Sequence, residues 1–364
     1  MADHTPIEWT DATWNPITGC SVVSPGCTNC YAMRLAGTRL RNHQSRIGLT
    51  RDTKAGPVWT GIVNLNAEWL DQPLRWSRPR RIFVCAHGDL FHESVPDDWI
   101  EGIFGIMAAA PQHTFQVLTK RAERMREWVS KTTLDRCQAE LCSGSWPESK
   151  LLLRRTDFIN GPWPLPNVWL GVSVEDQPRA DERIPRLLAT PAARRFISAE
   201  PLLGPVDLLW ALGRKIDVAA GLLRHGHFSP GLESLRRLDW VIAGGESGHG
   251  ARPMHPHWVR SLRDQCIGAG VPFFFKQWGE WAPICSMTSD EVDACYAPAP
   301  DRNPEATRRC KVETCVMQAN GDRLAVSSPL AFRAGMRSMT MMAIGKSKAG
   351  AQLDGREWRE MPHG

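Results

Sequence analysis

The feature that most restricts the fold of this 364-residue chain is a series of short apolar segments along its length. Helical patterns such as DDWIEGIFGIMAAA and PHWVRSLRDQCIGAG lie between them. Apolar strands that alternate with helices indicate a parallel sheet covered on both faces by crossover helices. The sequence therefore predicts an α/β fold of the (β/α) barrel class, partial or complete. Its expected strands lie in residues 5–18, 81–93, 113–121, 167–176, 195–204, 239–248 and 271–280.

The composition changes near residue 281, which predicts two parts. Residues 1–281 are expected to form the barrel domain, with a cysteine loop near its N-terminus. Residues 282–364 are expected to form an irregular extension that packs on the barrel, with a turn at Asp354 and Gly355 near its end. Polar or aperiodic composition predicts loops or insertions at three places, residues 44–61, 130–166 and 212–237.

The charge and targeting signals are weak. Lysine and arginine number 44 against 39 aspartate and glutamate, a net charge of +5 that permits a nucleic-acid partner without requiring one. No apolar run approaches the length of a membrane span, and the N-terminus MADHTPIEWTD lacks the features of a secretion signal. We therefore expect a cytoplasmic protein without a membrane partner, in a compartment where cysteines stay reduced and bind metals.

The stretch WNPITGCSVVSPGCTNCYAMR places Cys20, Cys27 and Cys30 in one loop with the spacing C-x6-C-x2-C. Its proline and glycine residues disfavour helix and strand, so three thiols are held close together. A closed structural zinc site takes four ligands. A cluster that acts on a bound molecule instead leaves one iron without a protein thiolate. Three cysteines without an obvious fourth favour an iron-sulfur cluster.

Two other interpretations of this loop stay open. One is a zinc site completed by His4 or by a distant cysteine, and the other is plain buried cysteine. A C-x2-C pair inside a Gly/Pro loop is typical of chelation rather than packing. Elsewhere, uneven spacing makes weak metal candidates of Cys137 and Cys142 and of the late cysteines Cys285, Cys295, Cys310 and Cys315.

The segment GCTNCYAMR resembles the end of the cluster loop of radical S-adenosylmethionine (radical SAM) enzymes of the spore photoproduct lyase kind. Residues 7–281, together with 354–358, resemble an uncharacterised, often phage-encoded family with the same three-cysteine motif. The usual radical SAM spacing is C-x3-C-x2-C, whereas the first gap here has six residues. The resemblance implies a 4Fe-4S cluster on Cys20, Cys27 and Cys30 and S-adenosylmethionine as cofactor.

The resemblance also implies an activity. Such an enzyme takes an electron from a donor such as a flavodoxin or ferredoxin. It generates a 5′-deoxyadenosyl radical that abstracts hydrogen from a substrate, here an unidentified one that could be a nucleic-acid base or nucleotide. The alternative is a zinc-binding, nucleic-acid-binding or nuclease-like phage protein without radical chemistry. Anaerobically purified protein would be brown in the first case and colourless with zinc in the second.

Polar residues follow six of the expected strands, at the ends where parallel barrels collect their chemistry. They are His87, Asp89 and His92; Lys120 and Arg121; Ser173 and Glu175; Ser198 and Glu200; Glu246 and Ser247; and Lys276 and Gln277. Any one of them is more often a solvated loop residue or a helix cap than a ligand contact. Six successive strands that end in this way are more informative than each residue alone.

The resemblance implies cofactor contacts at three of these strand ends. Gly88 and Asp89 stand where the family contacts the amino group of S-adenosylmethionine. Ser173 and Glu175 stand where polar residues bind the ribose. Gly244, Gly245 and Glu246 are placed to cradle the methionine carboxylate or the adenine edge, although a tight turn explains a glycine pair equally well.

The cations at the strand ends predict an anionic substrate. Lys120, Arg121 and Lys276 are expected to converge on one mouth, with Glu200 beside them, and to create a local positive field. The alternative is that the lysines form structural ion pairs with Glu200 or Glu246. The 16 tryptophans could stack on bases, but packing in the core is the more frequent role of large aromatic side chains.

Overall fold

The computed structural model describes residues 5–143, 161–213, 237–298 and 308–362. The chain forms two compact units. The first comprises residues 1–173, 181–198 and 222–239, and the second comprises residues 174–180, 199–221 and 240–364. Each unit is described by itself.

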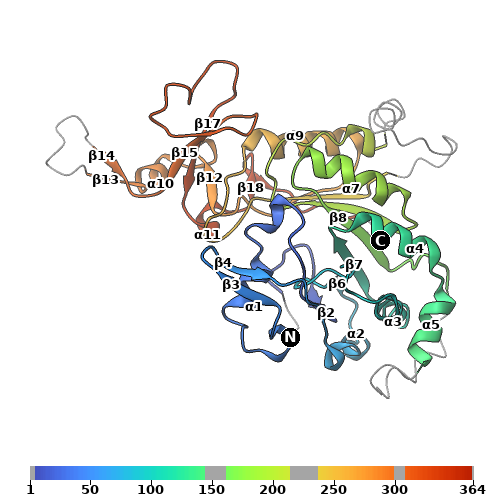
Figure 1. Ribbon diagram of the computed structural model, residues 1–364. Coiled ribbons are helices and arrows are strands. Elements are labelled where there is room, and N and C mark those ends of the chain that lie inside the picture. Colours follow the sequence, from blue (N-terminus) through green and yellow to red (C-terminus); the bar gives the residue numbers. More distant parts are fainter. Residues whose placement is uncertain (1–4, 144–160, 214–236, 299–307, 363–364) are drawn as a thin grey trace. The chain divides into compact units, whose positions relative to one another are not determined.

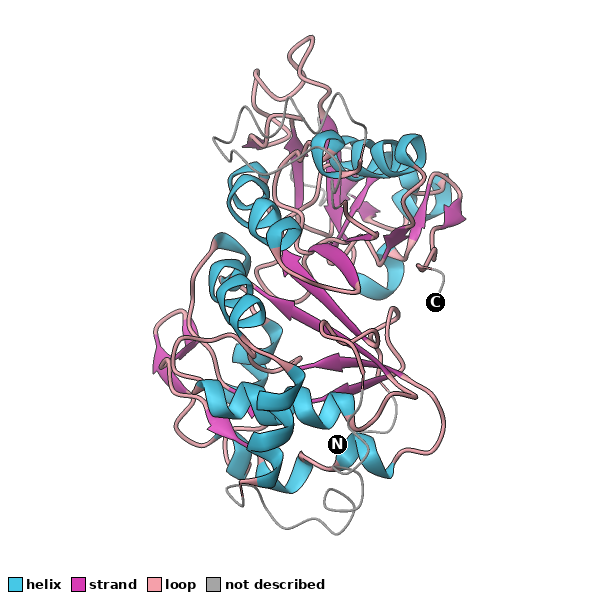
Figure 2. Cartoon of the chain, turned by 90° about the vertical axis from the view of Figure 1, so that its right-hand side faces the viewer, coloured by secondary structure: helices cyan, strands magenta, loops and turns pink. Residues whose placement is uncertain are grey.

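A parallel sheet forms from the predicted strands, and Figures 1 and 2 show its arrows. Hydrogen bonding gives the order β1-β6-β7-β8-β9-β10-β11. The pairs from β1 to β9 are parallel, as is the pair of β10 with β11. The order begins at β1 and ends at β11, so the described strands form a partial rather than a complete barrel. The strands are β1 (Ala12–Trp14), β6 (Arg81–Val84), β7 (Thr114–Thr119), β8 (Val168–Ser173), β9 (Arg194–Ala199), β10 (Trp240–Ala243) and β11 (Phe273–Phe275).

Burial explains why these segments form strands without a polar face. All residues of β8, β10 and β11 are buried, as expected when helices cover both faces of a parallel sheet. A Cβ atom at Gly171 would lie 2.6 Å from the ring of Phe196, so glycine leaves room for this aromatic ring. Trp14 and Trp240 are fully buried, in agreement with a packing role.

The helices follow the expected pattern of alternation. In α3, Ile100, Ile103 and Phe104 are buried, while Asp97 and Asp98 occupy the first turn, where acidic side chains favour the helix dipole. In α9, Gly270 ends the helix in the left-handed conformation, with φ of 63°. The longer helices are α3 (Asp97–Ala108), α4 (Ala122–Lys131), α5 (Leu134–Cys142), α7 (Gln177–Ala189) and α9 (Pro256–Ala269).

Residues 44–61 are not the loop that their composition predicts. They contain the 3-10 helix η2 (Gln44–Arg46) and an antiparallel hairpin of β3 (Thr50–Thr53) and β4 (Gly56–Trp59). The hairpin is largely exposed and therefore lacks the apolar alternation that marks a strand in a sequence. Around it lie β2 (Ile17–Thr18), η1 (Pro25–Cys27), α1 (Tyr31–Gly37), β5 (Asn64–Leu65), η3 (Ala67–Trp69) and α2 (Gln72–Arg75).

The expectation of an irregular extension after residue 281 is also wrong, because much of it is antiparallel sheet. Four strands have the order β12-β17-β15-β16. The indole nitrogen of Trp258, on α9, donates to the Ala319 carbonyl at 2.7 Å, which ties the extension to a helix of its own unit. The sheet strands are β12 (Trp281–Pro283), β15 (Thr314–Met317), β16 (Arg323–Leu324) and β17 (Met339–Ala343).

The last residues form the predicted turn. Asp354 and Gly355 have φ of 55° and 80° and join β18 (Gln352–Leu353) to β19 (Arg356–Glu357), while Trp358 is buried. Another short hairpin is made by β13 (Tyr296–Pro298) and β14 (Arg308–Cys310). The remaining elements are η4 (Leu209–Ala211), η6 (Ile284–Ser286), α10 (Ser289–Asp293) and α11 (Lys346–Ala349).

The other two expected loops lie partly outside the described residues. Within 130–166, α5 is present and residues 144–160 are outside; within 212–237, residues 214–236 are outside. His4, weighed as a zinc ligand, is also outside. No helix in the part of the chain that the structure describes is long and apolar enough to cross a bilayer.

Candidate metal centre

The cysteine loop begins where two backbones meet closely. The amide of Gly19 donates to the His87 carbonyl at 3.2 Å, and Gly19 forms a parallel bridge with Gly88. Gly19 has φ of +98°, and a Cβ atom there would lie 2.2 Å from the Ile62 carbonyl oxygen. A Cβ atom at Gly88 would lie 3.0 Å from the carbonyl oxygen of Ile17. Both glycines therefore serve close backbone approach, which places Cys20 beside the end of β6.

Two of the three cysteines of the loop share one environment. Cys20 and Cys30 both pack against a buried apolar cluster that includes Leu49 and Trp59. Cys27 ends η1 and is buried, and its carbonyl accepts from the amide of Cys30 at 3.3 Å. All three are free thiols. The short turn from η1 to α1 thus brings the C-x2-C pair together.

Two cations from the end of β7 act on these thiols. Burial raises the pKa of Cys20 to about 12, with a further rise caused by Asp89, while Arg121 acts in the opposite direction. Burial also raises the pKa of Cys30, and the charge of Lys120 opposes that rise. Cation contacts favour thiolate, the form that binds metals. Arg121 therefore favours the thiolate of Cys20, whereas at Cys30 the opposition to burial comes first from the backbone amides of Met33 and Ala32 and least from Lys120.

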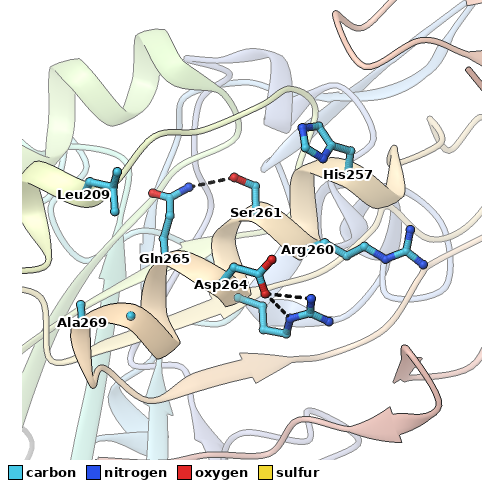
Figure 3. A pocket seen from close by; sticks show the side chains of 9 residues that line it. Leu209, His257, Arg260, Ser261, Asp264, Gln265 and Ala269 are labelled. Carbon is cyan, nitrogen blue, oxygen red and sulfur yellow. Dashed lines mark hydrogen bonds and ion pairs between the residues drawn. The ribbon is translucent and has the colours of Figure 1, made fainter. Parts of the chain in front are cut away.

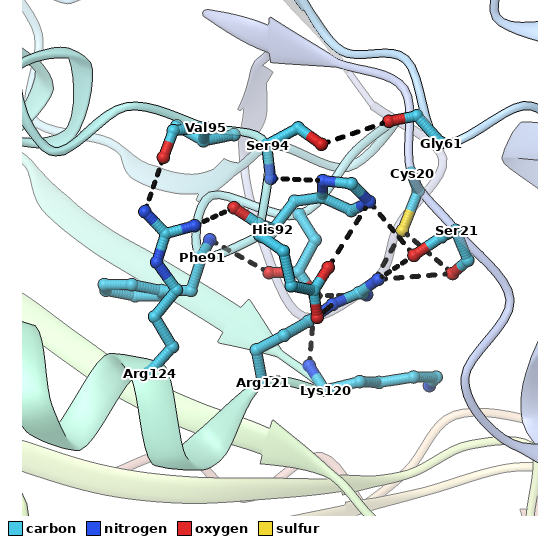
Figure 4. Close-up of polar contacts among 12 residues, drawn as sticks. Cys20, Ser21, Gly61, Phe91, His92, Ser94, Val95, Lys120, Arg121 and Arg124 are labelled. Carbon is cyan, nitrogen blue, oxygen red and sulfur yellow. Dashed lines mark hydrogen bonds and ion pairs between the residues drawn. The ribbon is translucent and has the colours of Figure 1, made fainter.

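Arg121 is the centre of a buried polar network, shown in Figure 4. Its Nη1 donates to Sγ of Cys20 at 3.3 Å and to Oδ2 of Asp89 at 3.1 Å. Its Nη2 donates to Oγ of Ser21 at 2.6 Å, and its Nε donates to Oε1 of Glu93 at 3.2 Å. Arg121 is only 7% exposed. In this arrangement it holds the cysteine loop, and the predicted contact with substrate stays a prediction.

Asp89 is the carboxylate that orients Arg121. Its Oδ1 accepts from the hydroxyl of Thr119 at 2.6 Å and from the amide of Phe91 at 3.0 Å, and its Oδ2 also accepts from the amide of Lys120 at 3.1 Å. With Arg121, four donors of the chain surround a side chain that is 4% exposed. Asp89 thus joins the ends of β6 and β7. Its predicted contact with a cofactor amino group stays a prediction.

The hydroxyl of Ser21 lies beside a histidine, but the two do not form a nucleophile and base pair. The amide of Ser94 donates to Nδ1 of His92 at 3.1 Å, so the neutral ring carries its proton on Nε2. That Nε2 lies 3.0 Å from Oγ of Ser21 and donates to it. Burial lowers the pKa of His92, which favours this neutral form. His92 therefore cannot accept the proton of Ser21.

Several predicted site residues belong to the second unit. Lys276 Nζ lies 2.6 Å from Oε1 of Glu200, and both side chains are largely buried. This is the ion pair weighed as the alternative to substrate binding. Glu246 likewise pairs with Arg252, whose Nη2 lies 2.5 Å from its Oε1.

The glycine pair before Glu246 packs against its own unit. A Cβ atom at Gly245 would lie 1.8 Å from the Trp278 carbonyl oxygen, and one at Gly244 would lie 3.4 Å from Cβ of Lys276. The amide of Gly245 donates to the Gln277 carbonyl at 2.9 Å. Close packing therefore explains Gly245 without a ligand. The predicted cofactor cradle stays a prediction.

Ser173 and Glu175 lie on either side of the division between the units. Ser173 ends β8 and is buried, and its carbonyl accepts from Nη1 of Arg183 at 2.8 Å. Glu175 is fully buried, and its carbonyl accepts from the amide of Leu203 at 2.7 Å. Their predicted ribose contacts stay predictions, as does the prediction that Asp89 and Glu246 share one cavity.

The structure adds a fourth thiol to the neighbourhood of the cysteine loop. Cys85 directly follows β6, is buried, and has φ of 57°, which is unusual for a residue other than glycine. Its amide donates to the Trp14 carbonyl at 2.8 Å, and burial, with a smaller contribution from the charge of Asp89, raises the pKa of its thiol. The sequence did not indicate Cys85 as a ligand, because a single cysteine after an apolar strand has no second cysteine at a metal-binding spacing. Within the described ranges, which include Cys20, Cys27, Cys30 and Cys85, no three His, Cys, Asp or Glu side chains are arranged to hold a metal ion, and the predicted cluster on the loop stays a prediction.

The late cysteines have separate surroundings. Cys295 donates to the Glu291 carbonyl and Cys310 to the Val312 carbonyl, both at 3.3 Å. Cys315 is buried in β15, while Cys285 is exposed. These contacts are those of ordinary buried or surface thiols.

A pocket of about 510 Å³ lies along α9, as Figure 3 shows. Its lining includes His257, Ser261 and Gln265. Arg260, which also lines it, pairs with Asp354 at 2.7 Å. No residue predicted for the site lines this pocket.

Comparison with known proteins identifies a family whose description names no activity. A family model described as "Protein of unknown function (DUF5131)" matches residues 4–362. No curated protein and no solved structure matches the chain.

Proposed function

Because the chain belongs to the DUF5131 family, whose description names no activity, we propose, from its three-cysteine loop and the resemblance of that loop to radical SAM enzymes, that it is a radical SAM iron-sulfur enzyme. The observation that carries the proposal is the contact of a buried cation with the cysteine loop. Nη1 of Arg121 donates to Sγ of Cys20 at 3.3 Å. The proposal rests on this environment together with the spacing of the three cysteines.

Three cysteines in one loop are a donor set suited to a cluster held by thiolates, although the described side chains are not arranged around a metal ion. Metal binding requires deprotonated sulfur, which burial opposes and neighbouring cations favour. A 4Fe-4S cluster on Cys20, Cys27 and Cys30 keeps one iron without a protein ligand. When bound, such a cluster supplies one electron that cleaves S-adenosylmethionine to methionine and a 5′-deoxyadenosyl radical.

The chain's own residues have separate tasks in this proposal. Arg121 stabilises the Cys20 thiolate and Asp89 holds Arg121 in place, so both are positioning residues. The apolar cluster beside Cys20 and Cys30 limits access of water to the sulfurs. An electron donor such as a flavodoxin or ferredoxin reduces the protein, and the hydrogen donor is a nucleic-acid base or nucleotide. Cofactor contacts are proposed for Gly88, Asp89, Ser173, Glu175, Gly244, Gly245 and Glu246.

The deciding experiment is anaerobic purification followed by iron and sulfide analysis and electron paramagnetic resonance of the reduced protein. We expect about four iron and four sulfide per chain, a brown colour, and 5′-deoxyadenosine when S-adenosylmethionine and dithionite are added. Cys20→Ala, Cys27→Ala and Cys30→Ala should each lose the iron. Cys137→Ala, at a buried thiol, and Cys285→Ala, at an exposed one, are controls that should keep it.

Cys85 is a candidate for the fourth ligand in the zinc alternative. A tetrahedral zinc site needs a fourth ligand, and this buried thiol lies at the same end of the sheet as the loop. In that case the protein would be colourless, contain one zinc, and lose it in Cys85→Ala as well as in the three loop variants. That result would overturn the radical SAM proposal. A three-thiolate cluster instead survives Cys85→Ala.

A further inference from the structure

A second feature of the first unit is a buried arginine with no acidic partner among the described residues. Arg46 is 4% exposed. Its Nη1 donates to the Ser45 hydroxyl at 2.8 Å and carbonyl at 3.2 Å, and its Nη2 lies 2.6 Å from Nδ1 of His87. Within the described ranges no carboxylate lies within ion-pair distance of it, and burial lowers its pKa to about 10. Arg46 is therefore charged at pH 7 and surrounded by neutral groups.

Such an arrangement is unfavourable for the protein alone. A buried charge without a counter-charge destabilises the folded state by several kcal/mol unless hydrogen bonds or a ligand compensate it. The Trp69 ring lies 6.0 Å from the guanidinium carbon and offers only a weak cation-π contact. The missing counter-charge is what an anionic ligand would supply.

Arg46 determines which nitrogen of His87 can meet that ligand. Guanidinium only donates hydrogen bonds, so Nδ1 of His87 accepts and the neutral ring carries its proton on Nε2. The guanidinium 2.6 Å from Nδ1 leaves no place there for a second ring proton. Among the described residues, no acceptor forms a hydrogen bond with Nε2. His87 thus keeps one N–H donor, at Nε2, while the positive charge of Arg46 lies at the other ring nitrogen, Nδ1.

Arg46 and His87 lie against both ends of the cysteine loop. The hydroxyl of Thr18 donates to the Ser45 carbonyl at 2.7 Å, and the amide of Gly19 donates to the His87 carbonyl at 3.2 Å. The ring of Tyr31, next to Cys30, stands edge-on to His87 with centroids 6.0 Å apart. Tyr31 is 55% exposed, so the aromatic wall beside His87 reaches solvent.

We propose that His87 and Arg46 form a receptor for an oxyanion, the carboxylate or phosphate group of a ligand that binds beside the cysteine loop. His87 Nε2–H donates to an anion oxygen, and Arg46 supplies the charge from the buried side. The exposed ring of Tyr31 borders the site. This receptor requires no metal, so it stands independently of the function proposed above.

The test measures binding of simple oxyanions to the full chain at pH 7 by calorimetry. Inorganic phosphate and AMP represent a phosphate source, acetate represents a carboxylate source, and adenosine is the neutral reference. We expect at least one oxyanion to bind, and its affinity to fall tenfold or more in Arg46→Met and in His87→Phe. Arg51→Met, at an exposed arginine of the same segment, should bind as the wild type does. Whether phosphate or acetate binds decides between the two sources.

Thermal unfolding separates this role from a structural one. Replacement of an uncompensated buried charge by an apolar side chain is neutral or stabilising, so Arg46→Met should unfold at the wild-type temperature or above. The bound oxyanion should raise the Tm of the wild type but not of Arg46→Met. His87→Phe keeps an aromatic ring beside Tyr31 and tests the donor separately if Arg46→Met fails to fold. Absence of binding to the wild type, or equal affinity in His87→Phe, would overturn the proposal.

Discussion

Nη1 of Arg121 donates a hydrogen bond to Sγ of Cys20 at 3.3 Å, although 101 residues separate them in the chain. The same guanidinium contacts Asp89 and Ser21, so one side chain joins the segments that follow β2, β6 and β7. The cysteine loop proposed to bind the cluster is therefore held by the charged side chain of Arg121, which is held in turn by the buried carboxylate of Asp89.

Asp89→Asn should destabilise the protein strongly. The substitution removes the buried carboxylate that pairs with a buried guanidinium and leaves only the exposed Glu93 as its partner, and such losses cost about 3–5 kcal/mol. Urea unfolding monitored by circular dichroism measures the change in free energy of unfolding. Asp97→Asn is the matched control, since Asp97 pairs with Arg124 and its side chain is 65% exposed; its change should be within about 1 kcal/mol. Equal effects of the two substitutions would mean that Asp89 does not hold Arg121.

Gly19→Ala should prevent the loop from forming its native contacts. The added Cβ would lie 2.2 Å from a backbone oxygen, and φ is +98°, so both sterics and backbone conformation oppose the change. We expect about 3 kcal/mol of destabilisation or more, together with loss of bound metal. Gly161→Ala, where no atom lies within 4 Å of the new Cβ, is the control. Wild-type stability and metal content in Gly19→Ala would contradict the observed backbone approach.

We expect the protein to lose stability in mild acid because His255 is buried. Burial lowers its pKa from 6.5 to about 4; its Nδ1 accepts from the His257 amide, and its Nε2 contacts the Arg337 carbonyl. Between these two pKa values the unfolded chain binds a proton that the folded chain does not. The free energy of unfolding should therefore fall as the pH decreases from 6.5 to 4, by up to about 1.4 kcal/mol per pH unit from this residue. Urea titrations at several pH values should show a smaller acid loss in His255→Asn.

The ion pair of Lys276 and Glu200 can be tested by a double-mutant cycle with Lys276→Met and Glu200→Gln. Their atoms lie 2.6 Å apart and the side chains are 15% and 20% exposed. We expect a coupling energy of about 1–3 kcal/mol in the free energy of unfolding. A coupling energy near zero would mean that Glu200 does not hold Lys276, which would then be available to contact an anionic substrate.

Much of the architecture was determined by local sequence pattern. Apolar runs such as RIFV and TFQVLT form strands because they are buried on both faces, and their order along the chain is their order in the sheet. The turn at Asp354 and Gly355 also follows from residue type, since glycine and aspartate tolerate positive φ. The hairpin at residues 50–59 escaped prediction because its strands are partly exposed, and the C-terminal sheet because its strands are short and show no regular alternation of buried and exposed residues.

The sequence also determined which residues could form the candidate site, through the spacing of Cys20, Cys27 and Cys30 and the polar residues after each strand. Only the tertiary structure decided their partners. Arg121 contacts a thiol and a carboxylate, Lys276 an acid, and Arg46 a histidine. Such pairings join distant segments, and the free energy of a buried charge depends on what surrounds it in space. Residue spacing carries no information about that environment, so a buried arginine without an acid can be recognised only in the folded chain.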